Sequence, residues 1–214
     1  MIRTSDLIDA LVADARPVRR LAPPLARAAA WLLVAALVFA LLALGHGVRA
    51  DLGARLVEPS FALGLAAALA TGILAATAAF MLNLPDRSRG WLLLPLPTLA
   101  LWIAGIGQAC LTNWVAIGPA GMQLGETARC FSTVLLTSLP LSIALFAMLR
   151  RGSVLRARAL ALMASIAVAA MTATAMSLFH RLDASALVLI WNLGVAGVIV
   201  ALGSWLGPRA ARAA

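Results

Sequence analysis

The sequence predicts an all-α, polytopic membrane protein, with six transmembrane helices and a short cytosolic amphipathic helix at the N-terminus. Of its 214 residues, 63% are hydrophobic and 12% are charged, and the mean hydropathy is +0.99. Soluble domains are about half apolar and one quarter charged, so this composition excludes an ordinary soluble protein. Six apolar runs are long enough to cross a bilayer, and arginines gather at their ends.

The N-terminal segment, residues 1–26, is the only long stretch outside the apolar runs. From Ser5 to Arg16 its pattern is that of an amphipathic helix, which Thr4 or Ser5 can cap and Pro17 ends. Its apolar arc consists of Leu7, Ile8, Leu11, Val12 and Ala15, whereas Asp6, Asp9 and Arg16 fall elsewhere. So short a helix is marginal in water and needs a cover for its apolar stripe. The lipid surface, the membrane domain or a groove on another protein could each cover this stripe.

The remainder of the chain, residues 27–214, forms the predicted transmembrane domain. Its six runs are approximately Ala28–Leu44, Phe61–Leu84, Trp91–Leu111, Phe131–Leu149, Leu155–Phe179 and Ala184–Leu206, against a need of about 20 residues per helix. Alanine-rich faces in the second and fifth runs permit close helix packing. Tryptophans near the run ends, including Trp31 and Trp91, indicate an aromatic belt. Pro140 lies inside the fourth run and predicts a kink.

The arginines predict the orientation. Thirteen fall on one side of the six-span arrangement, namely Arg3, Arg16, Arg19, Arg20, Arg27, Arg87, Arg89, Arg150, Arg151, Arg156, Arg158, Arg209 and Arg212. The other side has four, which are Arg49, Arg55, Arg129 and Arg181. Positive residues remain in the cytosol, so both termini are predicted to be cytosolic. Because the arginines follow membrane topology, the high pI of 11.7 does not indicate direct nucleic-acid binding.

Both cysteines and both histidines fall at the side opposite the arginines. His46 ends the first run, Cys110 ends the third, Cys130 opens the fourth and His180 ends the fifth. Such residues can bind a thiophilic metal, and two cysteines in an oxidising compartment can form a disulfide. The alternative is that they only pack, because no metal-ligand spacing is present.

The interiors of the runs exclude several function classes. None has a charged residue near its centre, where transporters and pumps usually place one. Asn192, midway along the sixth run, predicts an interhelical hydrogen bond. No nucleophile elbow, phosphate-binding loop, metalloprotease motif or dinucleotide fingerprint occurs. We therefore expect neither an enzyme nor a resident cofactor.

Several stretches resemble a known family. The opening TSDLIDALVADARPVRRLAPPLARAAAWLL resembles the N-termini of NrsF-type membrane anti-sigma factors, and the similarity continues through PDRSRGWLLLPLPTLALW, LTSLPLSIALFAMLRRG and SALVLIWN. The resemblance implies six spans and a cytosolic N-terminus that holds an extracytoplasmic-function sigma factor inactive at the bacterial inner membrane. It also implies release under heavy-metal or oxidative stress through periplasmic cysteines.

The sensing residues that the resemblance implies are Cys130 and Cys110, with transient heavy-metal binding, and His180 is a candidate substitute ligand beside them. Cys130 matches a family cysteine, and Cys110 is a second candidate. The chain departs from the family pattern at Arg181–Leu182, where relatives have Cys-Pro, and at Asn192, where relatives have histidine after the tryptophan.

The predicted function is therefore that of an anti-sigma factor whose partners are the sigma factor and the lipid bilayer. The predicted partner-binding residues are Asp6, Leu7, Ile8, Asp9, Leu11 and Val12. The alternative is a small channel or transporter whose N-terminal helix only anchors to the membrane surface. Co-purification of a sigma factor would favour the first function, and solute flux in proteoliposomes the second.

The arginine distribution makes a topological prediction. Reporter fusions after Pro24, Arg89, Arg151 and Arg212 should all report the cytosol, and a fusion after Gly121 should report the opposite side. A periplasmic signal from the Arg151 fusion would contradict the six-span arrangement.

Overall fold

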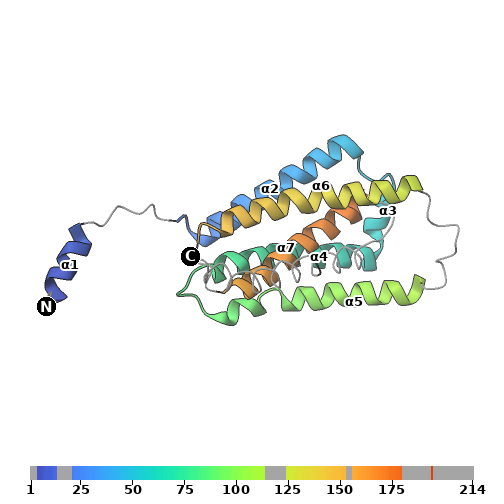
Figure 1. The fold of residues 1–214 in the computed structure, drawn as a ribbon. Helices are drawn as coiled ribbons and strands as arrows, with labels where there is room; N and C mark the ends of the chain where they lie inside the picture. The colour runs from blue at the N-terminus through green and yellow to red at the C-terminus, as the bar shows by residue number, and fades with distance from the viewer. Residues whose placement is uncertain (1–3, 14–20, 114–123, 153–155, 180–193, 195–214) are drawn as a thin grey trace.

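The computed structural model describes residues 4–13, 21–113, 124–152, 156–179 and 194. Every element in these ranges is helical, which confirms the all-α class (Figure 1). The elements are α1 (Thr4–Ala13), α2 (Pro24–His46), α3 (Leu52–Val57), α4 (Pro59–Leu82), the 3-10 helix η1 (Arg89–Leu93), α5 (Leu96–Asn113), α6 (Leu124–Leu149) and α7 (Ala157–Phe179).

Five helical stretches in the described residues are long and apolar enough to cross a membrane. They are α2, α4, the stretch Arg89–Ile106, the stretch Ser132–Leu149 of α6, and α7. Each corresponds to one of the first five predicted spans, and the sixth, Ala184–Leu206, lies outside the described residues. Several predicted spans were too short: α2 begins at Pro24 rather than Ala28, α5 continues to Asn113, and α6 begins at Leu124 rather than Phe131. The short helix α3 had no counterpart in the predicted spans.

Prolines and a glycine determine where several helices begin or end. Pro24 and Pro59 occupy the first positions of α2 and α4, where a missing N–H costs least. Gly47 follows α2 with a φ of 72°, a value that residues with a Cβ rarely adopt, and its N–H donates to the Ala43 carbonyl. Pro140 lies inside α6, and the helix continues through it.

The α4–α7 pair forms the centre of the bundle (Figure 1). Small residues of both helices are almost completely buried: Ala75, Ala76, Ala78 and Ala79 on α4, and Ala167, Ala169, Ala170 and Ala173 on α7. At Gly72 the backbone approaches Met171 so closely that a Cβ would lie 3.0 Å from its Cε atom. The alanine-rich faces predicted for the second and fifth spans are therefore confirmed as a packing interface.

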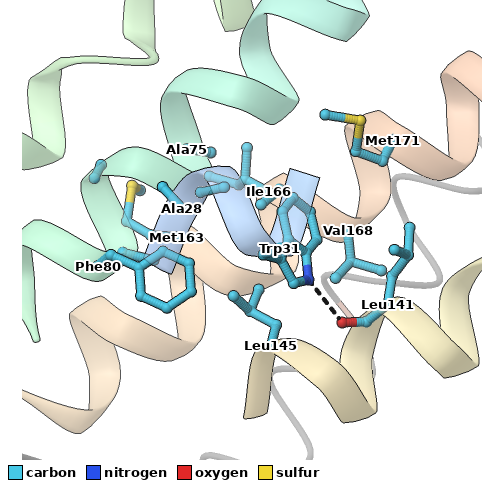
Figure 2. Close-up of a cluster of buried hydrophobic side chains, with 14 of the residues drawn as sticks. Ala28, Trp31, Ala75, Phe80, Leu141, Leu145, Met163, Ile166, Val168 and Met171 are labelled. Carbon is cyan, nitrogen blue, oxygen red and sulfur yellow. Dashed lines mark hydrogen bonds between the residues drawn. The ribbon is translucent and has the colours of Figure 1, made fainter. Parts of the chain in front are cut away.

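The remaining spans pack around this central pair. α5 contacts α4, whereas α6 contacts α2 and α7. Figure 2 shows Trp31 of α2 inside a cluster that includes Phe80, Leu145 and Ile166. The Trp31 indole N–H donates to the Leu141 carbonyl of α6 at 3.1 Å. Trp31 is 0% exposed, so the prediction that it belongs to an interfacial aromatic belt was wrong, because its indole joins two helices instead.

Candidate functional site

The helix α1 contains all the residues predicted to bind a partner, namely Asp6, Leu7, Ile8, Asp9, Leu11 and Val12. Figure 1 shows α1 apart from the other helices. Ile8 is 54% and Val12 69% exposed, and Asp9 is exposed as well. The side chains of Asp6, Leu7 and Leu11 lie outside the described part of the structure. Of the predicted apolar arc, the two described side chains are thus uncovered.

The first turn of α2, residues 24–27, contains a buried arginine, and we call this turn the foot of α2. Ten residues, 14–23, separate it from α1. Arg27 is 7% exposed, and its Nη1 donates to Asn83 Oδ1 at 3.0 Å. Its Nη2 donates to the Met148 carbonyl, and its guanidinium carbon lies 5.0 Å from the centre of the Phe80 ring. Asn83 is 0% exposed and donates from Nδ2 to the Leu149 carbonyl at 3.1 Å. We call Arg27, Asn83 and the carbonyls of Met148 and Leu149 the Arg27 clamp.

The Arg27 clamp joins three helix ends. Arg27 belongs to the first turn of α2, Asn83 is the residue that follows α4, and Met148 and Leu149 are the last two residues of α6. Two of these ends are C-termini, where unpaired carbonyls and the helix dipole give partial negative charge. The arginine therefore places its positive charge between two negative helix ends. Its fork of donors is suited to contacting both at once.

The loops beside the clamp are also tied together. Gly152 approaches Asn83 so closely that a Cβ at this position would overlap the Asn83 amide. Arg156 donates to the Arg87 carbonyl at 2.7 Å and to the Pro85 carbonyl at 3.5 Å, which connects the loop after α4 to the turn before α7. These loops and the helix starts that follow them contain several arginines that the sequence assigned to one side: Arg87, Arg89, Arg150, Arg151, Arg156 and Arg158.

The opposite end of the bundle contains a second buried arginine. The Arg49 side chain is 5% exposed and pairs with Asp51 at 2.8 Å. Its backbone N–H donates to the Leu178 carbonyl at 3.2 Å, and its Nη1 donates to the Ser177 carbonyl at 3.4 Å. The guanidinium also lies over the Phe61 ring. Arg49 thus satisfies carbonyls at the C-terminus of α7.

The predicted sensing residues are described only in part. Cys110 lies near the end of α5 and Cys130 in the second turn of α6, and the side chains of both are outside the described residues, as is the whole of His180. His46 ends α2. No extended contact joins the described parts of α5 and α6, although the two helices are consecutive in the chain. The metal or redox set therefore stays a prediction.

Sequence reasoning assigned Arg27 to topology alone and overlooked Asn83. The available signals were an arginine directly before the first apolar run and an amide at the end of the second. Neither signal indicates that the two side chains meet, because 56 positions separate them in the chain.

The long apolar helices indicate a multi-span membrane protein, and the described apolar side chains of its short N-terminal helix α1 are exposed. A comparison with family models matches residues 11–212 to the NrsF family, described as negative regulator of sigma F, and the chain belongs to this family. The resemblance found in the sequence is thereby confirmed, and the family implies a negative regulator of a sigma factor. Searches of curated proteins and of solved structures gave no match.

The close approach of Gly152 to Asn83 makes a prediction about stability. Gly152→Ala should displace the Asn83 amide and lower the free energy of unfolding by about 1–3 kcal/mol, because the new methyl group has no space. Gly105→Ala is the matched control, since nothing lies within 4 Å of a Cβ there and alanine favours the α5 helix. Thermal unfolding of both variants in detergent measures the difference, and equal midpoints would contradict the packing described for Gly152.

Proposed function

We propose that this protein is an anti-sigma factor of the bacterial inner membrane, with cytosolic termini, that sequesters an extracytoplasmic-function sigma factor through residues 1–26. The observation that carries the proposal is the uncovered apolar arc of α1 in a member of a family of negative sigma regulators. The role is regulatory, and no catalytic step is required of the chain. The bundle serves to retain the captured factor at the membrane, away from RNA polymerase.

The exposure of Ile8 and Val12 bears on what covers the arc. The bundle does not cover these two side chains, although an isolated ten-residue helix gains little stability from its own hydrogen bonds. Lipid and a protein groove remain as covers, and the family favours the protein groove. The same family assignment favours sequestration over the channel or transporter alternative.

A charge placed in the apolar arc should release the partner. Leu11→Asp removes a side chain whose burial is worth roughly 1.5–3 kcal/mol and introduces a carboxylate, so the affinity for the sigma factor should fall at least about tenfold. The measurements are co-purification of the sigma factor with the full-length membrane protein and the activity of a sigma-dependent reporter. Reporter activity should rise while the amount of protein in the membrane stays constant.

The matched control is Ala13→Asp, which adds the same charge at an exposed position outside both the apolar arc and the predicted partner-binding residues. This variant should retain the sigma factor. If Leu11→Asp leaves the reporter silent at normal protein level, the anti-sigma assignment to α1 is wrong and a surface-anchor role is favoured.

We further propose that heavy-metal or oxidative stress releases the sigma factor through Cys130 and Cys110, with His180 as an additional ligand. What supports a role for Cys130 is its position on α6, the helix that contacts α2 at Leu141 and Met148. A change at the start of α6 therefore has a direct route to the foot of α2. A shared metal or a disulfide between the cysteines would additionally require α5 and α6 to approach each other.

The cysteine proposal predicts the induction behaviour of three variants. Cys130→Ser, Cys110→Ser and the double variant should reduce the induction of sigma-dependent transcription by cadmium, without changing its uninduced level. A shared ligand site would make each single variant as deficient as the double one, whereas independent roles would make the effects separate. Induction of the double variant equal to that of the parent would assign both cysteines to packing.

A further inference from the structure

The Arg27 clamp is unusual because a buried charge is satisfied by neutral groups. Among the described residues its partners are the Asn83 amide, the Met148 carbonyl and the Phe80 ring. Desolvating a guanidinium is costly, and an apolar residue of similar size often serves stability at least as well. Stability alone therefore gives a weak reason for arginine at this position. Its several directional donors instead fix the relative position of the groups that they contact.

The position of the clamp in the chain suggests what is being fixed. Arg27 is the fourth residue of α2, and only positions 14–23 separate α2 from α1. Ten residues extend at most about 36 Å, so the foot of α2 limits where α1 can be presented. The clamp holds this foot against the ends of α4 and α6. One turn further along, the bond from Trp31 to the Leu141 carbonyl holds α2 to α6 independently of the clamp.

From this geometry we infer that Arg27 is a positioning residue for sigma-factor binding: it fixes the foot of α2 so that α1 is presented at the arginine-rich end of the bundle. The inference rests on the proposed function of residues 1–26. It assigns Arg27 a role that acts through α1 and requires no contact between Arg27 and the sigma factor. Loss of the clamp lets the foot of α2 move. Binding of the sigma factor must then fix the foot of α2 again, and this ordering lowers the affinity.

The test compares two full-length variants that each break one link between α2 and α6. Arg27→Gln removes the bridge at the foot of α2, and Trp31→Phe removes the indole hydrogen bond one turn deeper. For each variant in detergent, the thermal unfolding midpoint and the dissociation constant for the purified sigma factor are measured. We expect Arg27→Gln to weaken binding on the order of tenfold, a coupling of ordinary size, and Trp31→Phe to leave binding within about twofold at a comparable loss of thermal stability.

Two further variants complete the experiment. Arg27→Lys retains the charge but cannot bridge two acceptors as a guanidinium does, so its affinity should be intermediate. Arg150→Gln removes an exposed arginine from the same end of the bundle and should bind as the parent does. If Arg27→Gln does not accumulate in the membrane, Asn83→Ala removes the other link of the clamp, between the first turn of α2 and the end of α4, and should also weaken binding.

The outcomes separate the two proposals. If the parent protein binds no sigma factor, the proposed function fails. If the parent binds and Arg27→Gln binds equally well, only the positioning role is overturned. If affinity follows the unfolding midpoint in both Arg27→Gln and Trp31→Phe, Arg27 is a structural residue without a separate positioning role.

Discussion

Backbone carbonyls at the ends of apolar helices are the constraint on which this structure depends. Each helix ends with carbonyls that have no partner within the helix, and a bilayer offers no water to satisfy those that lie below its surface. The protein satisfies such carbonyls with buried arginines at both ends of the bundle. Arg27 donates to the Met148 carbonyl at the end of α6 and to the side chain of Asn83 directly after α4, and Arg49 donates to the Ser177 carbonyl near the end of α7. In each case the positive charge lies where the helix dipole is negative.

This arrangement explains why the outer helix α2 has a defined place beside the central pair. The alanine-lined α4–α7 interface positions those two helices by close contact alone. α2 has larger side chains and fewer small residues at its contacts, so shape alone defines its position less well. Arg27 and Trp31 supply directional bonds to α6 at two depths. The first turn of α2, the part of this helix nearest to α1 in the chain, is therefore fixed relative to the bundle.

The membrane class, five of the six spans and the alanine interface were predictable because each depends on local composition. Span ends were less accurate: polar residues such as Asn113 and Glu126 continue the helices beyond the apolar runs. The partnership of Arg27 with Asn83 was not predictable, because it depends on how three distant helix ends meet. Trp31 was misassigned for the same reason, since its partner at Leu141 is 110 positions away. For α1 the pattern predicted the helix, but it could not identify the partner.

The alanines between α4 and α7 have a mechanical consequence. An alanine side chain has no rotamers to exchange, so the alanine part of this interface cannot adjust by repacking its side chains. Longer side chains such as Leu145 and Met163, at the contacts of the outer helices, can change rotamer as their helix slides. We therefore expect the α4–α7 pair to move as one unit and any sliding of helices to involve mainly the outer ones. A displacement of α6 would then move α2, to which it is hydrogen-bonded, more than it would move the α4–α7 pair.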